Sequence, residues 1–264
     1  MTTLGVDLLR LAWESILSAV GVSIKISGVF CHLTPEAEFL YSGTRLRREL
    51  ADLLIVHDHM IRGTTRRRAL LIQTKMGPVV RTIGNPAQQY LYEHWPQFEL
   101  SRSGGYLPGD RKLNPNNFGS SIGFISRTPV VSSSWLVSKP WPGRNPVAIN
   151  AGEFLTRMVL GKRGFGRSAD FVSTIPTSLP VNRPSNNHWS ITIEELLRIS
   201  ARRAITATHT RRFPHLGNIR GNIRNAPLRS LRFLGSIRSQ EDASPDEERG
   251  ISFIHIGTSG EALD

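Results

Sequence analysis

The sequence predicts an α/β fold in which a mixed central sheet is flanked by helices. Two segments, DLLIV at 52–56 and RALLIQTK at 68–75, have the length and composition of buried strands. Helical periodicity precedes them in residues 5–20, and a segment with proline in its first turn, 86–95, follows them. Strands that alternate with helices in this way are typical of α/β proteins. Hydrophobic residues make up 39% of the 264 residues, which is sufficient for a buried core.

The N-terminal segment, residues 5–20, is expected to form an amphipathic helix, because its apolar side chains recur at spacings of three and four. Gly21 is expected to end this helix. Residues 22–30 alternate loosely between polar and apolar and predict a strand. Residues 45–51 are compatible with either a short helix or an extended segment that leads into the strand at 52–56.

The two central strands are expected to pair antiparallel around a polar loop. This loop is predicted to hold His57, Asp58, His59, Gly63 and Thr64. Its first three residues have metal-binding side chains, but consecutive residues on a flexible loop rarely converge on one ion. We therefore interpret residues 57–59 as a surface loop.

The second half of the chain predicts shorter elements between loops. Residues 101–120 and 173–190 are rich in Gly, Asn, Ser and Pro and are expected to be loops. Short strands are expected at 121–126 and 134–137, helices at 152–161 and 191–205, and a final strand at 251–256. Thr192 is a candidate N-cap, with Glu194 and Glu195 in the first turn of its helix, where the helix dipole favours negative charge.

Charge is the unusual feature of the composition. There are 33 Lys and Arg against 21 Asp and Glu, a net charge of +12, and such a surplus favours polyanionic partners. Residues 202–238 contain nine arginines and no acidic residue, as expected of a segment that contacts a phosphate backbone. The acidic patch at 241–248 offers an alternative, in which the two segments pair within the chain.

The candidate nucleic-acid contacts are all basic and come from two segments, the loop GKRGFGR at 161–167 and the arginine-rich 202–238. They are Lys162, Arg163, Arg167, Arg220, Arg224, Arg229 and Arg232. We expect residues 1–172 to form the α/β core and residues 173–264 to form a basic, loop-rich C-terminal region with one helix and a final strand.

The compartment is predicted from cysteine usage and from the N-terminus. Cys31 is the lone cysteine and has no partner for an intramolecular disulfide, and no Cys/His cluster has zinc spacing. Asp7, Arg10 and Glu14 interrupt the N-terminal apolar pattern, which therefore predicts neither a signal peptide nor a membrane span. We expect a cytoplasmic protein without a membrane partner.

The residues that carry chemistry lie at the ends of the two central strands. Asp52 begins the first, and Gln73 and Lys75 lie two residues apart near the end of the second, so both point to the same face. An amide and an ammonium at the end of a buried strand need polar partners, and Asp52 and Glu49 are the nearest carboxylates in the sequence. Carboxylates that hold a divalent cation beside a lysine explain the arrangement, because Mg²⁺ prefers hard oxygen ligands.

The pattern Asp52…Gln73-Thr74-Lys75 resembles the PD-(D/E)XK (restriction-endonuclease-like) nuclease superfamily, in the Gln-X-Lys form of its Mrr-type branch. The resemblance covers about residues 45–92. It implies a restriction-endonuclease-like core in which Asp52 and Gln73 bind Mg²⁺ or Mn²⁺ and Lys75 assists hydrolysis.

Three further residues belong to the same resemblance. Glu49 is similar to the additional acidic residue that many members carry before the central strand, and it would be a further catalytic cation ligand. Gln88 and Gln89 resemble the supporting polar residues that the following helix directs at the site. The implied activity is Mg²⁺- or Mn²⁺-dependent cleavage of DNA, with RNA open as an alternative substrate. Such nucleases often serve in bacterial restriction or anti-phage defence, with an activating protein partner or as homo-oligomers.

Other interpretations of these residues stay open. In one, Glu49 and Asp52 form surface ion pairs with the arginines at 45, 47 and 48, and no cation binds. In another, the chain is a catalytically inactive nucleic-acid-binding or scaffold subunit that keeps the nuclease fold. In a third, it is a basic interaction module for an acidic protein.

Overall fold

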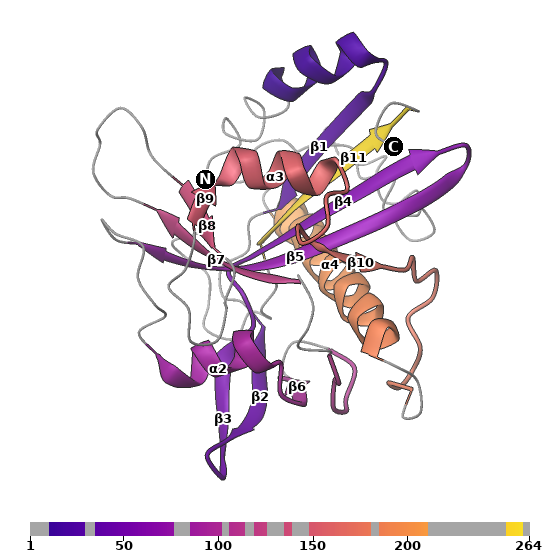
Figure 1. The fold of residues 1–264 in the computed structure, drawn as a ribbon. Helices are drawn as coiled ribbons and strands as arrows, with labels where there is room; N and C mark the ends of the chain where they lie inside the picture. Colours follow the sequence, from indigo (N-terminus) through magenta and orange to yellow (C-terminus); the bar gives the residue numbers. More distant parts are fainter. Residues whose placement is uncertain are drawn as a thin grey trace.

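A mixed central sheet with helices on both faces organises the chain, which confirms the predicted α/β class (Figure 1). The computed structural model describes residues 11–29, 35–76, 85–101, 106–113, 119–125, 135–138, 148–180, 185–210 and 252–260. The strand order in the sheet is β1-β11-β4-β5-β7-β8-β9, and β10 also pairs with β5. Segments that are far apart in the sequence therefore border the central pair β4–β5.

The centre of the sheet is an antiparallel hairpin of β4 (Leu53–Ile61) and β5 (Thr64–Met76). The two-residue turn between them, Arg62 and Gly63, has φ angles of 46° and 81°. Positive φ at both turn residues matches the right-handed twist of the strands it joins. On one side, β11 (Ser252–Ser259) runs parallel to β4, and β1 (Ser23–Val29) pairs antiparallel with β11.

The other half of the sheet is built on β5. Its second half pairs in parallel with β7 (Ser120–Ile125), and its first half pairs antiparallel with β10 (Arg167–Ala169). The chain between β5 and β7 contains α2 (Pro86–His94), as parallel neighbours require a crossover connection. β8 (Trp135–Ser138) and β9 (Ala148–Asn150) then complete the sheet with antiparallel pairs.

A second, three-stranded sheet lies beside the central one, with α2 close to it (Figure 1). It consists of β2 (Glu36–Tyr41), which pairs antiparallel with both β3 (Thr44–Glu49) and β6 (Phe98–Leu100). Three residues, 50–52, connect β3 to β4, and two of them, Leu50 and Ala51, are fully buried.

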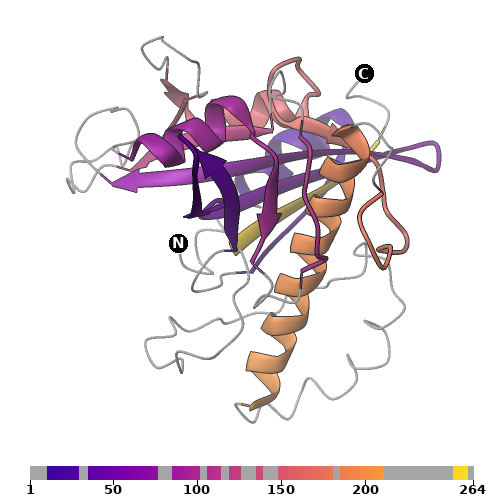
Figure 2. The same cartoon turned by 90° about the horizontal axis from the view of Figure 1, so that it is seen from below.

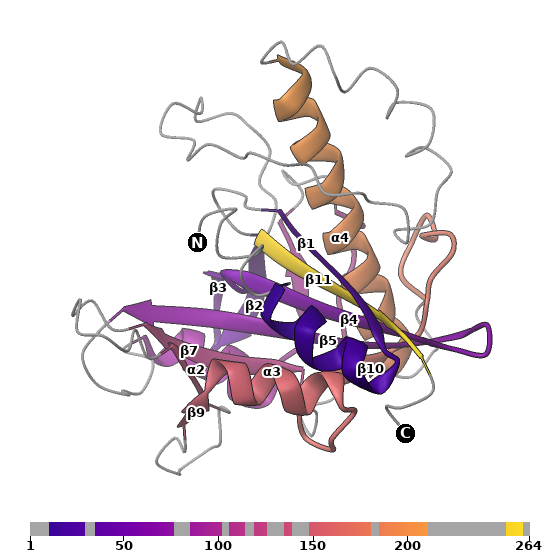
Figure 3. The same cartoon turned by 90° about the horizontal axis from the view of Figure 1, so that it is seen from above.

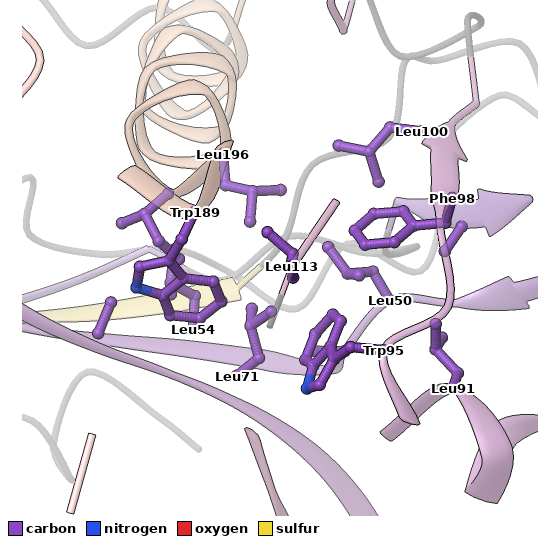
Figure 4. Packing of buried hydrophobic residues seen from close by; sticks show 14 of the residues in the cluster. Leu50, Leu54, Leu71, Leu91, Trp95, Phe98, Leu100, Leu113, Trp189 and Leu196 are labelled. Atoms are coloured by element: carbon purple, nitrogen blue, oxygen red, sulfur yellow. The ribbon is translucent and has the colours of Figure 1, made fainter. Parts of the chain in front are cut away.

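Alternation along the central hairpin produces two hydrophobic cores. Leu54 and Leu71 face α4 (Ser185–Thr210), which contributes Trp189 and Leu196 to the first core (Figures 2 and 4). The neighbouring residues in each strand face α3 (Ala151–Val159) on the opposite side of the sheet. The N-terminal helix, residues 11–17 with its extension η1 (Ser18–Val20), lies on the α3 side (Figure 3).

Most of the predicted elements are confirmed where the structure describes them. They are the N-terminal helix ending at Gly21 (φ 73°), the strand at 22–30, the central hairpin, the helix at 86–95, the strands at 121–126 and 134–137, the helix at 152–161 and the strand at 251–256. Residues 45–49 of the segment 45–51 belong to β3, so its helical alternative is wrong. Among the described helices, none is both long enough and apolar enough for a membrane span.

The predicted polar loop at 57–59 is wrong. β4 continues through His57, Asp58 and His59, and all three side chains are buried. Each has a partner across the sheet: both imidazoles lie 2.8 Å from Thr258 Oγ1, and the carboxylate accepts from Arg67 at 2.7 Å. Buried polar groups persist when they are hydrogen-bonded, so the strand extends beyond the end of its apolar pattern.

The helix expected at 191–205 begins earlier, at Ser185. Thr192 is therefore not an N-cap, and its hydroxyl instead donates to a carbonyl one turn earlier, at 2.7 Å. Glu194 and Glu195 lie inside the helix and are buried. Thr192, Glu194 and Glu195 indicated a helix start in the sequence, but in the fold they form buried hydrogen bonds from within the helix.

The region expected to be a basic, loop-rich C-terminal region with one helix and a final strand contributes both elements to the rest of the fold. Within 173–264, α4 packs on the central hairpin and β11 lies between β1 and β4. The loop expected at 173–190 is irregular up to residue 180 and helical from 185. The arginine-rich segment begins inside α4, and residues 211–250, with four of the candidate nucleic-acid contacts, lie outside the described residues.

Candidate active site

Three elements and the connection between β3 and β4 bring polar side chains together where the chain passes from the three-stranded sheet to the central sheet. Glu49 ends β3 and Asp52 directly precedes β4. Gln73 and Lys75 lie near the end of β5, and Gln88 belongs to α2. Hydrogen bonds link Gln88 of the helix to Gln73 and to the Glu49 backbone, and link Gln73 to Asp52.

Asp52 is held by the neighbouring strand. Its Oδ2 accepts from Gln73 Nε2 at 2.6 Å and from the Thr74 N–H at 2.5 Å. Burial raises the pKa of Asp52, the Thr74 N–H lowers it, and the charge of Glu49 raises it further; the net direction is upward. A cation beside this carboxylate would offset both the burial and the repulsion, so the position favours cation binding.

Gln88 connects the helix to the strands. Its Nε2 donates to the Glu49 carbonyl at 2.7 Å and to Gln73 Oε1 at 3.2 Å. The side chains of Gln88 and Gln73 are only 5% and 2% exposed, so unpaired amide groups here would have no water to bond instead. Leaving a buried polar group of this kind unsatisfied costs about 1–3 kcal/mol.

The start of α2 positions Gln88. Asn85 caps the helix, with its Oδ1 accepting from the Gln88 N–H at 3.1 Å, and Pro86 occupies the first turn. The same Asn85 oxygen accepts from Arg48 Nε at 3.2 Å, which ties the helix start to β3. The sequence therefore fixes where the helix begins and which residue faces the strands.

Tyr92 is a site residue that the sequence reasoning missed. It lies one turn after Gln88 on the same face of α2, is buried, and donates from its hydroxyl to the Leu50 carbonyl at 2.5 Å. Burial raises the pKa of Tyr92 well above its usual value, and the charges of Asp52 and Glu49 add to the effect. The four-residue spacing from Gln88 was a signal that could have identified it.

Glu49 and Lys75 leave the site accessible to a ligand. The Glu49 side chain is exposed, and those of Asp52 and Lys75 are partly buried. The Glu49 charge raises the pKa of Asp52 and the Lys75 charge lowers it, so both groups lie near enough to act on that carboxyl. Two carboxylates and one ammonium thus lie near one another at a place that solvent reaches.

The ion-pair alternative for the carboxylates fails in the described part of the chain. Arg47 Nε donates to Glu38 Oε2 at 2.8 Å, and Arg45 pairs with the same Glu38. Arg48 bonds Asn85 and a backbone carbonyl. The three arginines that could have neutralised Glu49 and Asp52 therefore bond other groups.

Other predicted residues are not brought to this site. Gln89 donates to Glu93 at 2.7 Å, along α2 and away from Asp52. Lys162 and Arg163 are exposed in the turn between α3 and β10. Arg167 is 7% exposed, with its guanidinium 5.1 Å from the centre of the Trp189 ring.

Burial changes what Arg167 can contribute. Its pKa falls to about 10 because burial disfavours the charged form. The side chain stays charged at neutral pH, but because it is buried it offers little surface to a phosphate backbone. The predicted role in nucleic-acid binding stays with the exposed Lys162 and Arg163, and with the arginines of 211–250 that lie outside the described residues.

The donor set at Asp52 fits a hard divalent cation. Mg²⁺ is typically held by one or two carboxylates, with water and substrate phosphate supplying the remaining oxygens, and Asp52 and Glu49 provide these carboxylates. No group of three or more His, Cys, Asp or Glu side chains that could hold a metal occurs among the described residues. The residues present therefore suit Mg²⁺ or Mn²⁺ better than a zinc site with a complete set of protein ligands.

A second polar cluster occupies the other end of the same hairpin. Arg67 Nε and Nη2 bind the two oxygens of Asp58 at 2.7 and 2.8 Å, and Arg67 Nη1 binds Glu194 of α4 at 2.7 Å. Glu194 also accepts from Arg198 Nε at 2.8 Å, and His255 Nε2 lies 3.0 Å from Asp58. This cluster attaches α4 to the two strands that carry the candidate site.

Comparison with known proteins adds no relative from which function could be transferred, since no family model, curated protein or solved structure matches the chain.

Proposed function

We propose that the protein is a Mg²⁺- or Mn²⁺-dependent nuclease that cleaves DNA phosphodiester bonds. The single observation that carries the proposal is the convergence of Asp52, Glu49, Gln73 and Gln88 beside Lys75. These residues come from β3, the connection between β3 and β4, β5 and α2, and the family resemblance had assigned them to one site. Chance surface polarity does not explain two nearly fully buried amides that connect a strand-end carboxylate to a helix.

The arrangement of strands around the site is consistent with a restriction-endonuclease-like core. β4 and β5 form an antiparallel pair, and after α2 the chain adds β7 parallel to β5. Asp52 and the Gln73-Thr74-Lys75 segment lie on this pair where the crossover helix packs. We keep the finer assignment to the PD-(D/E)XK superfamily as part of the proposal.

Each residue has a distinct role in the proposed reaction. Asp52 and Glu49 would hold the cation, which when bound polarises the phosphodiester and lowers the pKa of a water. Lys75 would orient the attacking water or stabilise the negative charge that develops on the phosphorus oxygens. Gln88 and Tyr92 hold the Glu49–Leu50 backbone against α2, which keeps the carboxylates in place.

The charge balance supports DNA as the substrate class. With a net charge of +12, the chain is attracted to a phosphate backbone, and Lys162, Arg163 and the arginines of 202–238 are the proposed contacts. RNA is a second polyanion that the same charges would attract. A role in restriction or anti-phage defence, with an activating protein partner or as a homo-oligomer, is part of the proposal through the family resemblance only.

A specific observation favours a second candidate, a non-catalytic nucleic-acid-binding or scaffold subunit. The hydrogen bonds among Asp52, Gln73 and Gln88 satisfy the buried amides without any cation. A fold that had lost the reaction could keep the same contacts for stability. Both the nuclease and the non-catalytic subunit would bind nucleic acid, but only the nuclease would cleave it.

A nuclease assay separates the candidates. Supercoiled plasmid, linear duplex and single-stranded DNA are incubated with the protein in Mg²⁺, in Mn²⁺ and in EDTA, alongside Asp52→Asn and the control Gln89→Met. The proposal expects divalent-dependent cleavage by the wild type and by Gln89→Met, and none by Asp52→Asn. DNA binding without cleavage in every condition would favour the scaffold alternative.

A further inference from the structure

A backbone carbonyl determines which atoms donate and which accept in the hydrogen bonds of the candidate site. The Glu49 carbonyl oxygen can only accept, so the group of Gln88 that lies 2.7 Å from it must be the Nε2 amide nitrogen. The orientation of the Gln88 amide is therefore fixed by the backbone of β3. The same nitrogen has a second hydrogen, and it lies 3.2 Å from Gln73 Oε1.

Gln73 inherits its orientation from Gln88. Because Gln88 presents a donor, Gln73 must present its oxygen to Gln88 and its nitrogen to Asp52, where Nε2 lies 2.6 Å from Oδ2. Turning the Gln73 amide by half a rotation would place nitrogen against nitrogen on one side and oxygen against oxygen on the other. Both amides are at least 95% buried, so water does not relieve the mismatch.

The orientation of the Gln73 amide makes the two oxygens of Asp52 unequal. A carboxylate oxygen has two lone pairs, and those of Oδ2 are directed at Gln73 Nε2 and at the Thr74 N–H. No described residue donates to Oδ1 of Asp52. A cation that binds this carboxylate therefore meets the available lone pairs at Oδ1, on the side that Gln73 does not reach.

We infer that Gln73 is a positioning residue and not a cation ligand: its amide donates to Asp52 Oδ2 and directs the divalent cation to Oδ1 and Glu49. This inference rests on the proposed function, because it takes a cation to bind at Asp52. It changes the role expected for the Gln-X-Lys position, where the amide oxygen would coordinate the metal. In this protein that oxygen accepts from Gln88.

Gln88→Met distinguishes the two roles by the sign of its effect on cation affinity. If Gln73 positions Asp52, then removing Gln88 loosens the amide and weakens binding, with Kd for Mg²⁺ rising about tenfold, as is usual when a partner of a metal ligand is lost. If Gln73 were a ligand, Gln88 would compete with the cation for Oε1, and its removal would tighten binding. Gln89→Met, on the same helix but bonded to Glu93, is the matched control and should leave Kd unchanged.

The measurement is calorimetric titration of the metal-free protein with MgCl₂, for the wild type and both variants, and of the wild type with MnCl₂ as well. Tighter binding by Gln88→Met would overturn the inference and leave the proposed function standing. Absence of Mg²⁺ and Mn²⁺ binding by the wild type would overturn both. The two failures are therefore distinguishable.

A second measurement is made on the wild type itself and uses a variant only to assign the signal. The side-chain amide signal of Gln73, assigned by its loss in Gln73→Met, is followed by ¹H–¹⁵N NMR with and without saturating Mg²⁺. Positioning predicts that one amide proton stays hydrogen-bonded and protected from solvent exchange in both states. Loss of that protection when Mg²⁺ binds would mean that the amide has turned its oxygen to the cation, and would overturn the inference.

Discussion

Replacing Arg67 with methionine tests whether the buried ion cluster fixes α4 to the strands of the candidate site. Methionine keeps the apolar stem and removes the guanidinium, which binds Asp58 through two contacts of 2.7 and 2.8 Å and Glu194 through one of 2.7 Å. The side chains of Arg67, Asp58 and Glu194 are only 1%, 11% and 2% exposed. The variant therefore leaves two carboxylates buried with less cationic compensation.

The expected loss of folding free energy follows from the burial of these three side chains. Removing one partner of a buried ion pair costs about 3–5 kcal/mol, because the remaining charge keeps its desolvation penalty. In a chain of this size about 1 kcal/mol corresponds to roughly 2–4 °C, so Tm should fall by about 10 °C. The matched control is Arg157→Met, which breaks an exposed pair with Glu153 (side chains 47% and 49% exposed) and should cost less than about 1 kcal/mol.

The pH dependence of the loss provides a second check. In the wild type, burial raises the pKa of Asp58, but hydrogen bonds from Arg67 and His255 outweigh it and hold that pKa below the ordinary value of 3.8. The stabilisation of the folded wild type by ionised Asp58 is fully present above the pKa of Asp58 in the unfolded chain, and it is lost as the pH falls through the lower pKa of the folded state. In Arg67→Met the folded pKa of Asp58 rises instead, because burial is no longer offset by the guanidinium, so the destabilisation of the variant becomes smaller as the pH falls. The difference in stability should narrow between neutral pH and about pH 4.

Thermal and urea denaturation followed by circular dichroism measure these differences directly. An Arg67→Met variant as stable at neutral pH as Arg157→Met would refute the reasoning. It would mean that water or rearranged side chains compensate the two carboxylates.

The remaining predictions concern the site and the substrate. Asp52→Ala and Lys75→Ala should each lower Mg²⁺-dependent cleavage by about two orders of magnitude or more while the circular dichroism spectrum is kept, because each removes a charge at the reacting position; cleavage by both variants would exclude this site. Gln73→Glu places a second carboxylate against Asp52, so the metal-free variant should melt below the wild type at pH 8 and approach it at pH 5, where one proton is shared; a Tm difference independent of pH would argue against the contact. Replacing four arginines of 202–238 together should weaken DNA binding and flatten its salt dependence by roughly 0.9 per lost phosphate contact; an unchanged slope in filter binding would remove this segment from the interface.

The parts of the fold that the sequence predicts well are those set by local patterns. The central hairpin, α2 and α3 have apolar periodicities and end signals that lie within the elements themselves. Side-chain alternation along β5 explains why Leu71 lies in one core and Ile72 in the other. The same alternation could place Gln73 and Lys75 on one face of β5, and the family resemblance could place Gln88 beside them from the following helix.

The errors occur where distant residues decide the local structure. The strand β4 continues through His57 and His59 because both bond Thr258, which is about 200 residues later in the chain. Judged from the neighbouring sequence alone, the polarity of these two histidines indicates a loop. The three-residue strands β6, β9 and β10 are too short for a periodic signal and form only because a longer strand is beside them.

The orientation of an amide is a further property that sequence could not supply. Gln73 could be placed on the correct face of its strand, but which of its two polar atoms meets Asp52 depends on Gln88 and the Glu49 carbonyl. That choice changes its expected role from cation ligand to hydrogen-bond donor. Tyr92 was missed for a similar reason, since its partner is a backbone carbonyl at Leu50.

The location of a bound cation tests the central claim most directly. A crystal of the protein soaked in MnCl₂ and measured at the manganese absorption edge would show the ion by its anomalous signal. We predict one peak at about 2.1 Å, within about 0.2 Å, from Asp52 Oδ1, with Glu49 bound directly or through water. A saturated soak without a peak at Asp52, or with the peak at another part of the chain, would contradict the account.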